Sequence, residues 1–211
     1  MSQLNDILNK NKLWSEKIQK EDPSFFKKLS NQQTPKILWI GCADSRVPAT
    51  QICDLDPGEM FVHRNVANLV VHTDINCLSV IQYAVEVLKV TDVIICGHYG
   101  CGGVETALSN VKMGLIDNWL RNIKDVIYWN EKELKALEND PQSQKNRLCE
   151  LNVTHQVMNL CSTTIVQDAW KSGQNVNVHG WIYGLKDGKI KDLGITVDSA
   201  EKVSSTFRLN L

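Results

Sequence analysis

The stretch that most constrains the fold of this chain begins with the apolar run Ile37 to Ile40 and breaks at Gly41. A short apolar run that ends at a glycine is typical of a strand buried in a parallel sheet. Cys42, Asp44 and Arg46 follow at alternating positions, and in an extended chain alternate side chains point to the same side. Open α/β sheets place their sites at the carboxyl ends of such strands. The sequence therefore predicts a functional site directly after this run.

A second apolar run, 92–96, ends in Gly97 and His98, and Cys101 follows three residues later between glycines. His98 and Cys101 have the close spacing of two ligands to one metal ion, and glycines allow the tight bend that this requires. Cys42 completes a Cys, His, Cys set. Three such ligands leave the fourth tetrahedral position of Zn²⁺ open for water, which distinguishes catalytic from structural zinc. We expect one Zn²⁺ ion per subunit.

The hydrophobic pattern predicts an α/β fold with a central, mostly parallel β-sheet flanked by helices. Strands are expected at 36–41, 60–66, 92–98, 175–185 and 190–197, and helices at 48–55, 74–89, 103–110, 115–137 and 147–171. The final hairpin would supply an antiparallel edge strand near the C-terminus. An amphipathic helix at 4–20 lies within an N-terminal helical arm, 1–35, and 36–211 would form a single zinc-binding catalytic domain.

Charge and composition exclude several classes of protein. A formal net charge of −1 over 211 residues gives no bulk attraction to nucleic acid or to anionic membranes. No apolar stretch approaches the ~20 residues of a membrane helix, and the first thirty residues lack the apolar core of a signal peptide. The seven cysteines are scattered through apolar runs, which fits a reducing compartment better than a disulfide scaffold. We expect a cytoplasmic protein that binds neither nucleic acid nor membranes.

The remaining cysteines and histidines are interpreted as structural. A lone cysteine is usually a small buried hydrophobic residue, and this interpretation applies to the five cysteines with no ligand at metal spacing, which are Cys53, Cys77, Cys96, Cys149 and Cys161. The four histidines outside the predicted zinc site are expected to pack or to lie at a surface or interface; they are His63, His72, His155 and His179. Asp44 and Arg46 alone would be a surface ion pair worth well under ~1 kcal/mol.

The ordered set of motifs resembles the zinc signature of the β-class carbonic anhydrases. The likeness covers Cys42-x-Asp44-Ser45-Arg46, Pro57-Gly58-Glu59, Arg64-Asn65-Val66-Ala67-Asn68, Gly97-His98-x-x-Cys101-Gly102-Gly103 and His179-Gly180-Trp181. It implies a zinc lyase that hydrates CO₂ reversibly to bicarbonate and a proton, by attack of zinc-bound hydroxide. Asp44 and Arg46 would be catalytic: paired with Arg46, the Asp44 carboxylate stays off the metal and accepts a hydrogen bond from the hydroxide. Freed from Arg46, Asp44 would become a fourth zinc ligand and close the site.

The resemblance also implies a substrate pocket, which by position comprises Gln33, Phe61, Val66 and Tyr83. In the family, part of that pocket comes from a neighbouring subunit, so a homodimer would be the minimal active unit, and a homotetramer is expected. The alternative for Phe61, Val66 and Tyr83 is core packing, which the pattern alone favours.

A further set of residues resembles a bacterial-type subset of the family, in which bicarbonate binds a non-catalytic site and inhibits the enzyme allosterically. These residues are Trp39, Gly41, Arg64 and Tyr183. An arginine with a tryptophan and a tyrosine can donate several hydrogen bonds to an anion. The alternative is that Trp39 and Tyr183 are core residues and Arg64 an interface residue.

Other functions stay open at this stage. Relatives of the same fold that hydrolyse CS₂ or COS share the motif, and a structural zinc or binding module would bind metal without catalysis. A zinc nucleobase deaminase would require His-x-Glu and Pro-Cys-x-x-Cys motifs, and the chain has neither.

Overall fold

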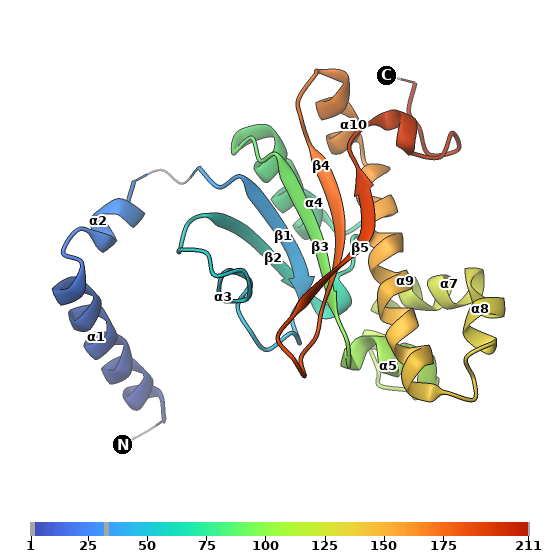
Figure 1. Cartoon of the computed structure of the whole chain (residues 1–211), viewed down its shortest axis with the longest axis horizontal. Coiled ribbons are helices and arrows are strands. Elements are labelled where there is room, and N and C mark those ends of the chain that lie inside the picture. The colour runs from blue at the N-terminus through green and yellow to red at the C-terminus, as the bar shows by residue number, and fades with distance from the viewer. Residues whose placement is uncertain (1–2, 32–33, 211) are drawn as a thin grey trace. The chain divides into compact units, whose positions relative to one another are not determined.

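The computed structural model describes residues 3–31 and 34–210, and the chain divides into two compact units, 1–34 and 35–211 (Figure 1). The first unit contains α1 (Gln3–Glu21) and α2 (Phe25–Leu29). Trp14 of α1 meets Phe26 of α2 edge to face, with ring centroids 5.7 Å apart. The expected N-terminal helix is therefore present, and its apolar residues Leu4, Ile7, Leu8 and Leu13 are exposed.

The second unit is built on a five-stranded sheet with the strand order β2-β1-β3-β4-β5. Its strands are β1 (Ile37–Cys42), β2 (Met60–Asn65), β3 (Asp92–His98), β4 (Asn177–Tyr183) and β5 (Ile190–Val197). The first four pair in parallel, and β5 runs antiparallel to β4. This confirms the predicted fold class, including the antiparallel strand near the C-terminus. Because β2 and β3 lie on opposite sides of β1, the strand order reverses at β1, and ligands bind at such a switch point.

Helices pack on one face of the sheet and enclose the main core. The helices are α4 (Ile75–Gln82), which continues into a π-turn at Tyr83–Val87, α9 (Pro141–Cys161) and α10 (Thr164–Lys171). Leu38 and Ile40 of β1 are buried in the same core as Val153 and Val157 of α9. The opposite face carries Trp39 in a smaller cluster that includes residues of the short helix α3 (Ala49–Ile52). The sheet therefore packs mainly against the helices on its α9 side.

A further cluster of helices lies near the carboxyl end of β3 (Figure 1). It comprises α5 (Gly102–Ser109), α6 (Ile116–Trp119), α7 (Arg121–Trp129) and α8 (Glu131–Lys135). Cys42 and Cys101 are buried in the same core as Ile123 of α7 and Leu148 of α9. This core therefore encloses the ends of the strands that were expected to carry the site.

Two of the long predicted helices are interrupted. The helix expected at 115–137 is divided into α6, α7 and α8, and at the end of α6 the Trp119 indole N–H donates to the Val66 carbonyl at 2.8 Å. The helix expected at 147–171 begins earlier, at Pro141, where the Asp140 side chain caps α9. It ends at Cys161, and Thr163 caps α10 by accepting from the Val166 N–H.

Three further segments complete the secondary structure. Val66–Asn68 and Ala200–Lys202 each form a short 3₁₀ turn, and α2 was not expected from the sequence. Across residues 3–31 and 34–210, no helix combines the length and apolarity that a membrane crossing requires.

Candidate metal centre

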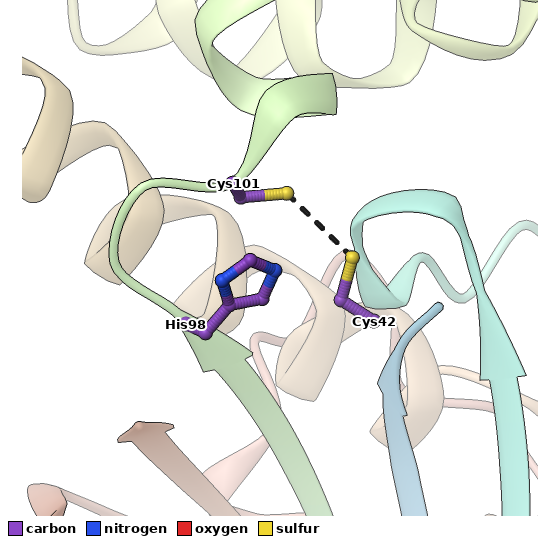
Figure 2. Close-up of side chains that lie close together, drawn as sticks. All are labelled: Cys42, His98 and Cys101. Atoms are coloured by element: carbon purple, nitrogen blue, oxygen red, sulfur yellow. Dashed lines mark hydrogen bonds between the residues drawn. The ribbon is translucent and has the colours of Figure 1, made fainter. Parts of the chain in front are cut away.

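Three predicted zinc ligands converge where β1, β3 and α5 meet (Figure 2). Cys42 is the last residue of β1, His98 is the last residue of β3, and Cys101 directly precedes α5. One ligand atom from each lies within 4.8 Å of the other two, and all three residues are buried. The two Sγ atoms are 3.6 Å apart. The convergence follows from topology, because β1 and β3 are parallel neighbours whose carboxyl ends meet.

The His98 ring is poised to bind a metal. Its Nδ1 lies 3.0 Å from the Tyr99 carbonyl oxygen, and since a carbonyl only accepts, Nδ1 carries the proton. Nε2 then presents a lone pair, and this atom is buried without a hydrogen-bond partner among the described residues. An unpartnered buried polar atom costs about 1–3 kcal/mol. A metal ion satisfies it, and two sulfurs with one imidazole nitrogen are a ligand set that suits Zn²⁺.

The surroundings of Cys42 favour the thiolate that a metal requires. Its Sγ accepts the backbone N–H groups of Asp44 at 3.3 Å and Ala67 at 3.2 Å. The pKa of Cys42 is lowered, mainly by the hydrogen bond with the Cys101 thiol and further by the two N–H groups, although burial opposes the shift. The pKa of Cys101 is raised because its proton is shared with Cys42 and because it is buried. The pair therefore holds negative charge where a cation would bind.

A network of buried amides holds the loop that carries Ala67. Ala67 and Asn68 have left-handed φ angles of 66° and 50°, a backbone conformation that residues other than glycine rarely adopt. Asn152 of α9 donates to the Ala67 carbonyl at 2.9 Å, and Gln156 accepts the Val70 N–H at 2.9 Å and donates to Asn152 at 3.0 Å. We did not single out Asn152 and Gln156 in the sequence. The sequence signal that could have identified them is a pair of amide side chains at positions i and i+4 on an otherwise apolar helix face.

Asp44 and Arg46 form the expected pair, but on the surface. Arg46 Nη2 lies 3.4 Å from Asp44 Oδ1, and the two side chains are 59% and 43% exposed. The first N–H of α5, from Gly102, donates to Asp44 Oδ2 at 3.3 Å, and a helix N-terminus favours a carboxylate. Among the residues that the structure describes, the ligand cluster contains Cys42, His98 and Cys101 and does not include Asp44. Arg46 also has a left-handed φ of 62°.

Arg64 binds the segment between Cys42 and Val47, which carries both Asp44 and Arg46. Its Nε and Nη2 donate to the Cys42 carbonyl at 3.1 and 2.8 Å, Nη1 donates to the Val47 carbonyl at 3.4 Å, and Nη2 also binds the Ser45 hydroxyl. The guanidinium therefore holds the segment 42–47, which we call the Asp44 loop, by its ends and its centre.

The other residues of the expected bicarbonate site lie nearby in the sheet. Gly41 pairs with Arg64 between β1 and β2. A Cβ atom at Gly41 would be 2.5 Å from Trp39 Nε1, so the indole occupies the space that any larger residue would need. Trp39 and Tyr183 are buried in the same small cluster, on the sheet face opposite α9.

The described residues of the expected substrate pocket fall into two groups within this chain. Val66 packs against the core that contains Cys42 and Cys101. Phe61 packs against the main core, and its ring centroid is 5.8 Å from that of Tyr83, which is 49% exposed. Gln33 lies outside the described residues.

Comparisons with known proteins agree with this geometry. Residues 37–190 match the family model described as carbonic anhydrase. A carbonic anhydrase of Emericella nidulans is 48% identical over 189 residues, which cover 90% of this chain and 82% of that protein.

Two solved structures give the same result. A Coccomyxa β-carbonic anhydrase in complex with acetazolamide is 36% identical, with a TM-score of 0.88 over 95% of this chain and 90% of the other. A tetrameric β-carbonic anhydrase from Sordaria macrospora is 40% identical, with a TM-score of 0.86 over 92% of this chain and 98% of the other.

Proposed function

The chain belongs to the β class of the carbonic anhydrase family, and on this premise we propose how its residues control the enzyme. The activity is the reversible hydration of CO₂, with zinc at Cys42, His98 and Cys101. Zn²⁺ bound there activates a water molecule for attack on CO₂. The observation that carries the function is the unpartnered Nε2 of His98 beside two sulfur atoms.

Stopped-flow CO₂ hydration tests the activity. We expect the zinc-loaded protein to turn over, removal of zinc by a chelator to abolish turnover, and reloading to restore it. A protein that binds zinc through these ligands and hydrates no CO₂ at any pH from neutral to alkaline would instead be an inert zinc module or a hydrolase of CS₂ or COS.

We propose that Asp44 orients the attacking water in the active state. Its carboxylate is engaged by Arg46 and by the Gly102 N–H, and these contacts support a position from which it accepts a hydrogen bond without binding the metal. Both groups are partly exposed, so the pair is weakly held. Asp44→Asn should keep zinc bound but lose most turnover, because an amide is a weaker acceptor. Full activity of that variant would exclude the role.

We propose that bicarbonate inhibits the enzyme by competing for Arg64. Three of its nitrogens already bind the Asp44 loop, so an anion that takes this guanidinium releases the loop. Asp44 is then free to leave Arg46 and to bind zinc as a fourth ligand. Trp39 of β1 and Tyr183 of β4, which are buried in the same small cluster, would line the anion site beside Gly41.

The test measures CO₂ hydration with and without added bicarbonate as the pH falls. We expect activity to fall toward acid pH and bicarbonate to deepen the fall, and Trp39→Phe to weaken the bicarbonate effect. Inhibition that is absent in the parent enzyme, or unchanged in Trp39→Phe, would refute the bicarbonate site and leave the activity assignment intact.

We propose that the enzyme assembles as a homotetramer whose minimal active unit is a dimer. The Sordaria macrospora relative is tetrameric. The exposed apolar residues of α1 and, in the second unit, the half-exposed Tyr83 each support an apolar surface that a second subunit covers. Light scattering should give a tetramer for the full chain and a smaller species after deletion of residues 1–20. An unchanged, active oligomer would argue against the arm as an interface.

We propose that the enzyme works in the cytoplasm. All seven cysteines are unpaired, which supports a reducing compartment. Cell fractionation that finds the enzyme in an oxidising compartment would contradict this proposal.

A further inference from the structure

A second group of metal-ligating side chains lies outside the catalytic site and comprises His63, Asp74 and Cys77. His63 belongs to β2, Asp74 is the N-cap of α4, and Cys77 lies in the first turn of that helix. One ligand atom from each lies within 4.8 Å of the other two. From the sequence we interpreted Cys77 as a buried hydrophobic residue without a ligand at metal spacing, and His63 as a packing, interface or surface residue. That interpretation overlooked Asp74, three residues before Cys77.

Each of the three side chains keeps an atom available. Oδ1 of Asp74 accepts two N–H groups of the first turn of α4, at 3.1 and 3.3 Å, and no hydrogen bond from the described residues engages Oδ2. The Cys77 thiol has only a long contact, 3.9 Å, to the Leu69 carbonyl. His63 Nε2 has only the 3.3 Å contact from the Asn65 amide, which a metal bound to that nitrogen would replace.

The three groups do not satisfy one another. Within the part of the chain that the structure describes, neither a hydrogen bond nor an ion pair joins the side chains of His63, Asp74 and Cys77, although they converge. His63 is 7% exposed and Cys77 is fully buried. Asp74 beside them is partly buried, and polar side chains at such short range normally bond to each other, so this arrangement suits an ion that bridges them.

We propose that His63, Asp74 and Cys77 bind a second, thiophilic divalent cation of the Zn²⁺ type, separate from the catalytic zinc. A nitrogen, a carboxylate oxygen and a sulfur are all zinc ligands, whereas Mg²⁺ and Ca²⁺ require oxygen ligands. As the sulfur–metal bond forms, the Cys77 thiol releases its proton to the buffer. Water would complete the coordination.

The second ion would lie at the base of the loop that supports the catalytic thiolate. Asn65, whose side chain donates to His63, also binds both the N–H and the carbonyl of Leu69, at 2.7 Å each. The loop between Asn65 and Leu69 contains Ala67, the N–H donor to Cys42. A metal bridging β2 and α4 therefore stabilises the folded state by binding it selectively, and the melting temperature should rise with the concentration of the ion.

Titration with Cd²⁺ of the full-length enzyme loaded with one Zn²⁺ per chain, enough for the catalytic site alone, tests the proposal. Cd²⁺ is a thiophilic substitute for Zn²⁺ whose thiolate complexes absorb in the ultraviolet. After removal of free metal, we expect the parent enzyme to retain its catalytic zinc and to carry about one additional Cd²⁺ per chain, with a thiolate-to-metal absorption band. Loss of a residue that hydrogen-bonds to a metal ligand already lowers metal affinity about 10–100-fold. Loss of a direct ligand should therefore lower the affinity for Cd²⁺ at least about tenfold.

Two variants and a matched control separate the site from adventitious thiol binding. Cys77→Ala should remove the added Cd²⁺ and its band. Asp74→Asn should weaken Cd²⁺ binding at least about tenfold while it preserves the helix cap, because asparagine caps as well as aspartate. Cys161→Ala removes another fully buried cysteine and should leave the added Cd²⁺ in place.

Three outcomes would overturn the proposal. The parent enzyme could take up no additional Cd²⁺, or Cd²⁺ could enter only in exchange for the catalytic zinc. The additional Cd²⁺ could also persist unchanged in both Cys77→Ala and Asp74→Asn. None of these results bears on CO₂ hydration, which is measured separately.

Discussion

Replacement of Arg64 by methionine tests how the Asp44 loop is held. Methionine keeps an apolar stem but lacks donors, so the contacts to the Cys42 and Val47 carbonyls and to the Ser45 hydroxyl are lost. A hydrogen bond from a charged group contributes about 1.5–3 kcal/mol. The bonds from Nε and Nη2 share the Cys42 carbonyl, and the side chain is half-buried, so we count these two as one such bond. The expected loss in free energy of unfolding is about 2 kcal/mol.

That loss has consequences for both melting and turnover. For a chain of this size, about 2 kcal/mol lowers the melting temperature by about 4–8 °C. If the whole amount favours release of the loop, and hence movement of Asp44 toward zinc, kcat falls by up to about 30-fold. Inhibition by bicarbonate should disappear as well, because its proposed target is gone. Thermal melts and stopped-flow CO₂ hydration, with and without bicarbonate, measure these effects.

Arg121→Met is the matched control, because Arg121 is an exposed arginine at the start of α7. Exposed substitutions usually change stability by less than about 0.5 kcal/mol. If Arg64→Met melts and turns over like Arg121→Met, the loop is held by other contacts and the reasoning is wrong. If bicarbonate inhibits both variants equally, Arg64 is not the anion site.

Three further predictions follow from single contacts. Gln156→Leu leaves the buried Val70 N–H without its acceptor and should lower the free energy of unfolding by about 1–3 kcal/mol. Urea denaturation should show this as a lower midpoint. An unchanged midpoint would contradict the role of the amide network. Gly97→Ala places a Cβ 2.7 Å from Val153 Cγ2 and should lower the free energy of unfolding by about 1–3 kcal/mol. Adding Val153→Ala to this variant should restore part of the lost stability. If it restores none, the strain lies elsewhere. The pKa of Glu150 is lowered because hydrogen bonds from Lys191, Tyr99 and Arg147 outweigh burial, which alone would raise it. Its stabilising contribution is therefore complete above the ordinary value of 4.5 and is lost as the pH falls below it, so Glu150→Gln should flatten the acid side of a plot of melting temperature against pH.

The strands and the zinc ligands could be predicted because their signals are local. A strand that is buried on both faces must be apolar throughout, so β1 and β3 stand out as short apolar runs. Their parallel pairing brings Cys42 and His98 to one edge without any knowledge of side-chain packing. The cap of α4 is a local feature as well, because Asp74 accepts N–H groups from the first turn of the helix that follows it.

The remaining features depend on contacts between distant segments, which no local pattern reveals. The break after Trp119 coincides with an indole that binds a carbonyl 53 residues away. The cluster of His63 with Asp74 and Cys77 forms only because α4 packs back against β2. Thr163 is the exception, since a threonine cap is a sequence signal, and it was hidden by the apolar pattern that runs through α9 and α10.

The zinc ligands and the Asp44–Arg46 pair are held with different strength, and this difference supports the proposed control through Asp44. Cys42, His98 and Cys101 are buried at the ends of paired elements, and Cys42 receives two backbone N–H groups, so the ligand set is rigid. Asp44 and Arg46 are 43% and 59% exposed, and Arg46 has a left-handed φ of 62°, which costs energy for a residue other than glycine. A weak pair beside a rigid metal site can be displaced by an anion without loss of the metal, so inhibition through Asp44 should be reversible and should leave zinc bound.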